Sequence, residues 1–202
     1  MPQDDKVTPS QKLAPEASAM FVITPQIKLG YEEYCLIPND GNRHEVIDGL
    51  HYVSPAPTVN HQAVSRWLQY QMFTRIEIPG LGKVMDAPVD VQLGVHDIVQ
   101  PDLVVVLTEN VAVLTDSRVV GPPDLIVEIL SKSTAKHDQT LKRLLYERCG
   151  VREYWIADPA ACRIDQFVLE NGAYRQIDSS ATQLTMTIIP DMVIPLGDIW
   201  NH

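Results

Sequence analysis

One acidic residue interrupts an otherwise apolar segment of the chain. Residues 125–130 are Leu-Ile-Val-Glu-Ile-Leu, a pattern typical of a strand buried on both faces, with Glu128 as its one charge. An isolated carboxylate in an apolar interior is very unfavourable unless it is neutralised or protonated. Glu128 therefore requires a positive partner, which is either a bound metal ion or a neighbouring Arg or Lys.

A second carboxylate, Asp102, stands just before another continuous apolar run, residues 103–107. Consecutive strands usually lie side by side, so we expect residues 101–107 to pair with 125–130 and to bring Asp102 close to Glu128. Mg²⁺ is commonly bound by one or two carboxylates together with water and substrate phosphate. The two acidic residues therefore predict a divalent-cation site at one end of a sheet, with an ion pair of Glu128 to Arg or Lys as the alternative.

Turn residues and apolar spacing predict the elements that position this pair. Asp48-Gly49 and Asn171-Gly172 favour tight hairpin turns, in which both residues take left-handed backbone conformations. The predicted strands are 43–47 and 50–54 in the first hairpin, 89–93, 103–107, 125–130 and 154–157 in between, and 163–169 and 173–177 in the second hairpin. The predicted helices are 31–36, 61–76 and 135–149.

Both longer helices are predicted to bury one face, because their apolar residues recur at intervals of three and four. In the helix over 135–149 we expect Leu141, Leu144 and Leu145 to point inward and Gly150 to be the left-handed C-cap. Residues 186–200 are apolar enough to pack back against the body of the protein. The order of elements predicts a mixed α/β structure around a central sheet.

The composition fits a single domain. A chain of 202 residues with 45% hydrophobic residues can form one compact core. We assign residues 20–202 to that domain and expect residues 1–19, which are polar and aperiodic, to be a disordered tail. No segment resembles a signal peptide or a membrane span, and the cysteines form no CxxC pair, so we expect a cytoplasmic protein without membrane attachment.

The net charge of −10 is unusual for a protein that binds nucleic acid, since a basic surface normally attracts phosphate. Residues 131–152 are a local exception, with six Lys or Arg against two acidic residues, a net charge of +4. This stretch is either a solvated helix face or a surface that contacts phosphate.

Several strings in the sequence resemble the Uma-two family of endonucleases, which belongs to the PD-(D/E)xK restriction-endonuclease-like superfamily. The resemblance spans residues 27–170, with the motifs in the family's order and at similar spacings. The strings are HEVIDG (44–49), QPD (100–102), LIVEILSKST (125–134), Lys142 followed four residues later by Tyr146, and GVREYWIADP (150–159).

The resemblance implies a restriction-endonuclease-like α/β fold, with a mixed central sheet flanked by helices and hairpins near both ends. It also implies that Asp102, Glu128 and the backbone carbonyl of Ile129 bind Mg²⁺ or Mn²⁺, and that Glu45 is an additional acidic catalytic residue. The superfamily's simplest motif has a lysine two residues after the acidic residue, where this chain has Leu130. In this family the role of that lysine falls to a lysine in the following helix, which corresponds to Lys142.

The spacing of Lys142 from its neighbours allows a separate prediction. Asp138, Lys142 and Tyr146 share one helix face at four-residue intervals. The spacing by itself favours an exposed Asp138–Lys142 ion pair, whereas the resemblance favours a catalytic lysine that holds the attacking water or neutralises the scissile phosphate.

Weaker candidates for contacts to nucleic acid are spread over two predicted helices. For His61 a purely structural role at the start of its helix is the alternative, and a transition-metal cluster of His44, His51 and His61 is disfavoured because no HxxxH spacing occurs. Tyr154 and Trp155 are expected in the core rather than on a base-stacking surface. The predicted nucleic-acid contacts are His61, Lys132, Lys136, Arg143 and Tyr146.

The leading functional hypothesis is a metal-dependent endonuclease that hydrolyses phosphodiester bonds in DNA. One active site per chain favours a homodimer for cutting both strands of a duplex. The net charge and Leu130 support an alternative, a catalytically weak or inactive nuclease fold that binds nucleic acid or another partner. A glycosidase with a carboxylate pair is disfavoured, because a sugar cleft needs aromatic walls and only 6% of the residues are aromatic.

Overall fold

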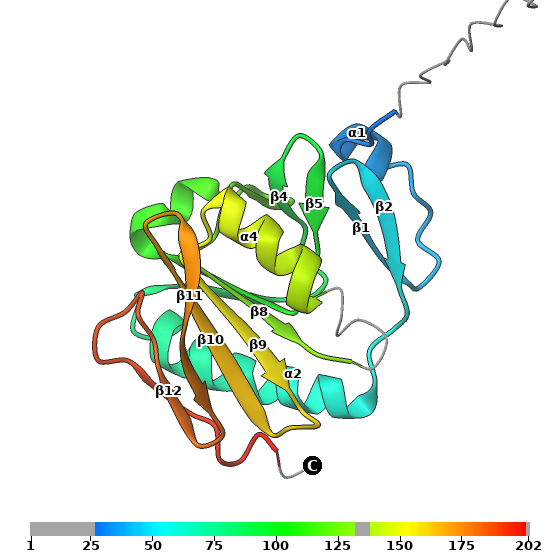
Figure 1. Ribbon diagram of the computed structural model, residues 1–202. Coiled ribbons are helices and arrows are strands. Elements are labelled where there is room, and N and C mark those ends of the chain that lie inside the picture. The colour runs from blue at the N-terminus through cyan, green and yellow to red at the C-terminus, as the bar shows by residue number, and fades with distance from the viewer. Residues whose placement is uncertain (1–26, 132–137, 201–202) are drawn as a thin grey trace, which may run out of the picture.

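The computed structural model describes residues 27–131 and 138–200, so the predicted tail at 1–19 lies outside the described residues. The chain is built around a sheet of six strands in the order β11-β10-β9-β8-β6-β3 (Figure 1). These strands are β3 (Gly82–Asp86), β6 (Leu103–Leu107), β8 (Leu125–Ile129), β9 (Glu153–Asp158), β10 (Arg163–Glu170) and β11 (Ala173–Ser180).

Strand β8 carries Glu128. It pairs antiparallel with β6, with Leu103 opposite Val127, which confirms the predicted pairing of the two apolar segments. If this register is continued by one residue, Asp102 comes to lie opposite Glu128. Strand β9 runs parallel to β8, so the chain crosses between them through a π-helical turn (Asp138–Lys142) and α4 (Arg143–Cys149).

A second sheet, in the order β2-β1-β5-β4-β7, carries the first hairpin. Asp48 and Gly49 have φ angles of 53° and 79°, as the predicted turn requires. Helix α1 (Tyr31–Tyr34) lies next to this sheet in Figure 1. The strands are β1 (Arg43–Ile47), β2 (Leu50–Ser54), β4 (Val91–Gly94), β5 (Asp97–Val99) and β7 (Val119–Val120).

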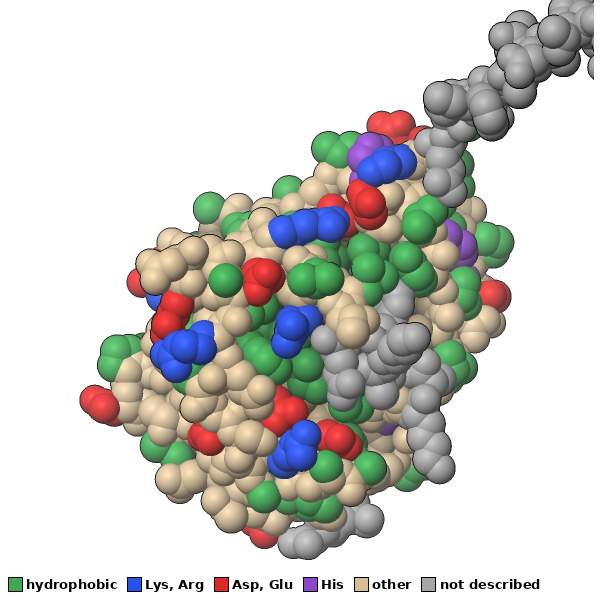
Figure 2. Space-filling view, viewed as in Figure 1, with side chains coloured by type: hydrophobic (Ala, Val, Ile, Leu, Met, Phe, Trp, Pro, Cys, Tyr) green, Lys and Arg blue, Asp and Glu red, His purple; other side chains and the backbone are tan. Residues whose placement is uncertain are grey.

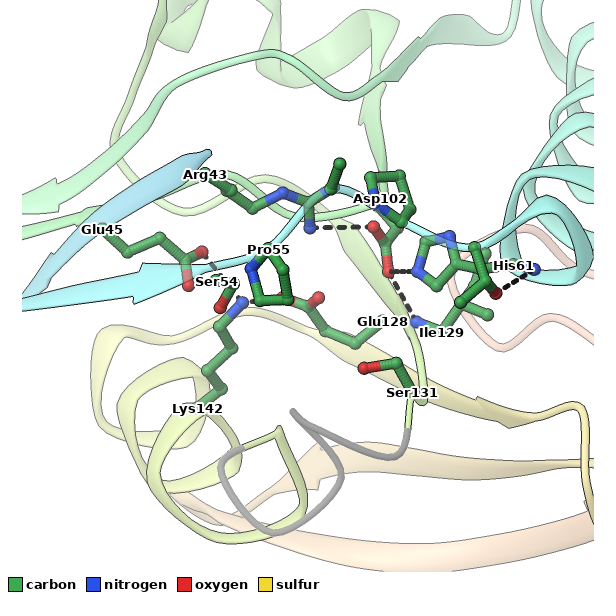
Figure 3. Close-up of a pocket in the computed structure, with 13 residues that line it drawn as sticks. Arg43, Glu45, Ser54, Pro55, His61, Asp102, Glu128, Ile129, Ser131 and Lys142 are labelled. Atoms are coloured by element: carbon green, nitrogen blue, oxygen red, sulfur yellow. Dashed lines mark hydrogen bonds and ion pairs between the residues drawn. The ribbon is translucent and has the colours of Figure 1, made fainter. Parts of the chain in front are cut away.

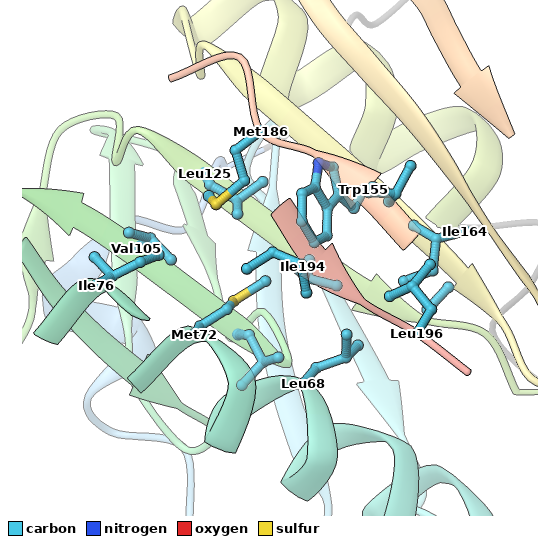
Figure 4. Packing of buried hydrophobic residues seen from close by; sticks show 14 of the residues in the cluster. Leu68, Met72, Ile76, Val105, Leu125, Trp155, Ile164, Met186, Ile194 and Leu196 are labelled. Atoms are coloured by element: carbon cyan, nitrogen blue, oxygen red, sulfur yellow. The ribbon is translucent and has the colours of Figure 1, made fainter. Parts of the chain in front are cut away.

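One face of the six-stranded sheet is covered by α2 (Val59–Met72) and by the C-terminal segment. Helix α2 starts at Thr58, whose side chain caps it, and continues through a π-helical turn, Phe73–Glu77. Of the apolar stripe predicted for this helix, Trp67 is partly buried and Val64, Leu68, Met72 and Ile76 are buried. Leu68 and Met72 share one cluster with Ile194 of the C-terminal segment (Figure 4). That segment contains the strand pair β12 (Gln183–Thr185) and β13 (Val193–Pro195), and its docking was predicted.

The opposite face of the sheet is covered by α4. Leu145 and Tyr146 are fully buried there, whereas Leu144 is 55% exposed, so the prediction that Leu144 points inward is wrong. The helix turns the side with Tyr146 toward the sheet, and this rotation leaves Leu144 in solvent. Gly150 ends the helix with a φ angle of 86°, as predicted.

Several short strands were not predicted from the sequence. Strand β3 pairs with β6 at the sheet edge although Gly82, Lys83 and Asp86 break its apolar pattern. Strands β5, β7, β12 and β13 are two or three residues long. A segment of this length is too short to show the alternation of apolar and polar residues by which a strand is recognised in a sequence.

Candidate functional site: a carboxylate pocket

A small cavity of about 100 Å³ lies where β1, the start of β6, the end of β8 and the first turn of α2 meet (Figure 3). Its charged and titratable side chains come from segments far apart in the sequence. We call this cavity the carboxylate pocket; these side chains are Arg43, Glu45, His61, Asp102, Glu128 and Lys142. The rest of its wall is formed by residues 54–58, Ile129 and Ser131.

Lys142 joins two of the carboxylates. Its ammonium Nζ lies 2.8 Å from Glu45 Oε1 and 3.0 Å from Glu128 Oε1, and the lysine side chain is only 3% exposed. The interpretation of Lys142 as an exposed residue is therefore wrong; the side chain of Asp138 lies outside the described residues. The structure contains the alternative that was predicted for Glu128, an ion pair with a basic residue. The basic residue is Lys142, the lysine that the family resemblance indicated.

Glu128 and Glu45 each accept a further hydrogen bond from a neutral donor. The hydroxyl of Tyr146 donates to Glu128 Oε1 over 2.6 Å, and the backbone N–H of Gln100 donates to Glu45 Oε1 over 2.8 Å. Burial, followed by the charge of Glu128, raises the pKa of Tyr146 well above its ordinary value, so the phenol keeps the proton that it donates. The four-residue spacing of Lys142 and Tyr146 is what lets both side chains reach Glu128.

Asp102 is held by three groups from different elements. Nη1 of Arg43 lies 2.9 Å from its Oδ1, while His61 Nε2 lies 3.0 Å from Oδ2 and the N–H of Ile129 donates to Oδ2 over 2.7 Å. Burial alone raises the pKa of Asp102, but the hydrogen bond from His61 and the charge of Arg43 outweigh it and hold that pKa below the ordinary value.

Sequence reasoning missed Arg43. It stands two residues before Glu45 in the same strand, so both side chains lie on one face of β1, and this spacing was the available signal. His61 was predicted as a weak phosphate contact or a structural residue. The structure places it in the pocket against Asp102.

The pocket contains every buried side-chain atom without a hydrogen-bond partner in the described residues 27–131 and 138–200, namely Asp102 Oδ1 and His61 Nδ1. Arg43 Nη1 lies 2.9 Å from Asp102 Oδ1 and forms an ion pair with it. Buried polar atoms left unsatisfied in this way commonly indicate a missing ligand or ion.

The donor set suits a hard divalent cation, because three carboxylates and the carbonyl of Ile129 offer only oxygen ligands. In the described part of the chain no three acidic, His or Cys side chains already stand in a metal-binding arrangement. Lys142 bridges two of the carboxylates and Arg43 faces the third, so their ion pairs must open or shift for a cation to bind.

The basic stretch is only partly available for phosphate. Lys132 and Lys136 lie outside the described residues, and Arg143 lies over the Phe167 ring at 5.4 Å from its centroid. Tyr146 is fully buried, which argues against a direct contact with nucleic acid. Arg148 pairs with Asp97, and Arg152 pairs with Glu109 and Asp124. Figure 2 accordingly shows acidic and basic side chains mixed on this face.

The structure also shows where the remaining predicted histidine and aromatic side chains lie. His44 and His51 contact each other on the first hairpin, with 3.0 Å between their ring nitrogens, while His61 contacts Asp102 instead, so the three do not form a cluster. Tyr154 and Trp155 are buried in the core as expected. No helix in the described ranges is both long and apolar enough to cross a membrane.

Comparisons with known proteins agree with this architecture. The Uma2 family, described as "Putative restriction endonuclease", matches residues 31–198. A crystal structure of "a putative nuclease belonging to DUF820" from Anabaena variabilis ATCC 29413 superimposes with a TM-score of 0.70 at 16% sequence identity, covering 85% of this chain and 97% of that one. The predicted fold class is thereby confirmed. A search among curated proteins finds no match.

Proposed function

Because the chain belongs to the Uma2 restriction endonuclease family, we propose that it is a divalent-cation-dependent endonuclease that hydrolyses phosphodiester bonds in DNA. The observation that carries this proposal is the convergence of Glu45, Asp102 and Glu128 on one pocket.

Asp102, Glu128 and the carbonyl of Ile129 would hold Mg²⁺ or Mn²⁺, with Glu45 as an additional acidic ligand or base. A cation bound there would lower the pKa of a coordinated water and polarise the phosphate. His61 and the N–H of Ile129 fix the orientation of the Asp102 carboxylate, as partners of metal ligands commonly do.

Lys142 would neutralise negative charge on the scissile phosphate. Its ammonium lies between Glu45 and Glu128, at the carboxylate pocket where the phosphate would enter. With the charge of these carboxylates balanced by a bound cation, Lys142 would be able to turn its ammonium toward the phosphate while keeping one of its two carboxylate contacts. Arg43, which pairs with Asp102 on the other side of the pocket, would likewise turn toward the phosphate and neutralise part of its charge.

A cleavage assay tests this proposal directly. The protein is incubated with plasmid and with linear duplex DNA in Mg²⁺, Mn²⁺ or EDTA, together with Asp102→Ala and Glu128→Ala. We expect cleavage that requires the metal and is lost in both variants. Unchanged cleavage in both variants, or cleavage in EDTA, would contradict the assignment.

A second candidate is a nucleic-acid-binding protein with a nuclease fold and no catalysis. The observation in its favour is that Lys142 and Arg43 already neutralise the pocket carboxylates, as a structural ion-pair network would. It predicts DNA binding that is independent of Mg²⁺ and unaffected by Asp102→Ala. The homodimer and the cytoplasmic location remain predictions, which size-exclusion chromatography and cell fractionation can test.

A further inference from the structure

A larger cavity of about 550 Å³ adjoins the carboxylate pocket. The two share Arg43, Ala56 and Pro57 as a common wall. We call it the side cavity; its size falls within the range of about 300–1,000 Å³ that is typical of small-molecule sites. Its other walls come from α1, the following loop over residues 35–42, His44, Gln62 of α2, the segment 87–90 and Gln100.

One wall of the side cavity is a closed set of hydrogen bonds. Asp90 Oδ1 accepts from the Tyr34 hydroxyl over 2.7 Å and from Gln100 Nε2 over 2.9 Å, and Gln100 Nε2 also donates to the Tyr34 oxygen over 3.0 Å. The donors are thus engaged within the set. What the wall can still offer is acceptors, because a carboxylate has about four lone-pair sites and an amide carbonyl has two. These acceptors are Asp90 Oδ2 and Gln100 Oε1.

The same wall is tied to the carboxylate pocket. Gln100 lines the side cavity with its side chain, and its backbone N–H donates to Glu45 Oε1 over 2.8 Å. Arg43 faces Asp102 and lines both cavities. A ligand that spans the two spaces would therefore meet a guanidinium between them, at the place where a phosphate joined to a base would lie.

The rest of the side cavity has apolar surface that suits the flat faces of a base. Ile37, Pro38, Pro57 and Pro88 provide this surface beside the acceptor wall, and the polar side chains of the remaining lining are Asn39, Asn42, His44 and Gln62. A negative carboxylate would repel a phosphate group, which keeps the phosphate on the Arg43 side. The acceptor wall selects an edge with adjacent N–H donors, and guanine carries such an edge in its ring N–H and exocyclic amino group.

We propose that the side cavity binds the base of the nucleotide next to the scissile phosphate, that it prefers guanine, and that the base leaves its stack to enter. This inference rests on the proposed nuclease function and names the substrate group that the site selects. A base can present its hydrogen-bonding edge to this wall only when its nucleotide is unstacked.

Cys35 provides a probe, since it lines the side cavity and is exposed. In a Cys149→Ser, Cys162→Ser background, the rate of Cys35 labelling by a thiol reagent is measured with dGMP, TMP or inorganic phosphate. We expect dGMP to slow labelling, TMP to do so at concentrations about tenfold higher, as loss of a charge-assisted hydrogen bond implies, and inorganic phosphate to have no effect. Equal protection by dGMP and TMP, or protection by inorganic phosphate alone, would overturn the proposal.

Asp90→Asn keeps an acceptor for Tyr34 and Gln100 but removes the charge, and it should weaken dGMP protection about tenfold. Asp178→Asn, on the exposed part of β11, is the matched control and should leave protection unchanged. Asn42 lines the side cavity outside the acceptor wall, so the bulk added by Asn42→Trp should weaken dGMP binding in calorimetry. Undiminished dGMP binding in both Asp90→Asn and Asn42→Trp would refute the subsite. A failure of the nuclease proposal would show separately, in Mg²⁺-dependent cleavage by the unmodified protein.

Discussion

Two buried glutamates on neighbouring strands, Glu128 in β8 and Glu153 in β9, are stabilised in different ways. The register places Leu125 opposite Glu153 and Glu128 opposite Ile156, so the two carboxylates lie at opposite ends of the strand pair. They also face opposite sides of the sheet. Glu153 and Trp155, two residues apart in β9, share the face on the side of α2. Glu128 lies on the opposite face, on the side of α4, with Tyr146.

Glu153 is satisfied by five hydrogen bonds from neutral donors. Trp155 and Gln166 donate to Oε1, each over 2.6 Å. The backbone N–H groups of Thr187 and Ile188 and the hydroxyl of Thr187 donate to Oε2 over 2.6 to 3.0 Å. These bonds attach the C-terminal segment to the sheet, which explains how a fully buried carboxylate is tolerated there.

The carboxylate pocket instead relies on ion pairs and leaves two buried atoms without hydrogen bonds. The contrast teaches that burial of an acidic residue does not by itself indicate a function. A carboxylate whose oxygens accept hydrogen bonds only from neutral donors, such as Glu153, stabilises the fold. Carboxylates that are paired with the side chains of Lys142 and Arg43 can exchange these partners for a metal ion when the side chains move.

The largest effect on stability is expected at Glu153. Glu153→Ala leaves five donors without their acceptor and should lower the free energy of unfolding by about 3–5 kcal/mol. Urea denaturation followed by tryptophan fluorescence measures this change, and Mn²⁺ affinity of the folded fraction should stay the same. A loss below about 1 kcal/mol would remove the distinction drawn between the two glutamates.

Lys142→Met should lower the free energy of unfolding by about 3 kcal/mol, because it leaves Glu45 and Glu128 buried without their cation. Mg²⁺ should restore part of this loss by taking the place of the ammonium, so the variant should gain more in melting temperature from Mg²⁺ than the unaltered protein gains. An equal gain in both proteins would indicate that the cation does not enter this pocket.

Glu128→Gln should affect activity far more than stability. The amide oxygen can still accept from Lys142 and Tyr146, so we expect the free energy of unfolding to change by about 1 kcal/mol or less. Cleavage should fall by a factor on the order of 10²–10³. Activity close to that of the unaltered protein would show that Glu128 is as structural as Glu153.

Asp102 predicts a smaller, pH-dependent effect in the absence of metal. Its pKa is lowered from 3.8, so the folded state releases this proton more readily than the unfolded state does. The resulting stability is present above about pH 4 and is lost as the pH falls through the lowered pKa. Asp102→Asn should therefore flatten the acid side of the stability curve measured by denaturant titration. An unchanged slope below pH 4 would contradict this.

The sequence predicted much of the fold because its strongest signals are local. The dipeptides Asp48-Gly49 and Asn171-Gly172 specify left-handed turns that occur as expected, with φ angles of 52° and 82° in the second hairpin. The apolar runs of β6 and β8 predicted both their burial and their pairing. The side of α4 that faces the sheet could not be predicted, because the sequence pattern allows either Leu144 or Tyr146 to be the buried residue.

The candidate site was predicted in part for the same reason. An acidic residue in an apolar strand is conspicuous, so Glu128 and its need for a cation were evident from the sequence. Arg43 and His61 lie in segments that suggest only an exposed hairpin and a helix start. Their contacts with Asp102 depend on how the two sheets and α2 come together, which involves separations of 41 residues or more and leaves no local pattern.

Calorimetric titration with Mn²⁺ measures binding of the cation to the carboxylate pocket independently of any reaction. The unaltered protein should bind one Mn²⁺ per chain, Asp102→Asn and Glu128→Gln should each weaken that binding by at least about tenfold, and Asp178→Asn should leave it unchanged. Absence of binding by the unaltered protein, or equal affinity in all four proteins, would show that Asp102 and Glu128 do not hold a cation.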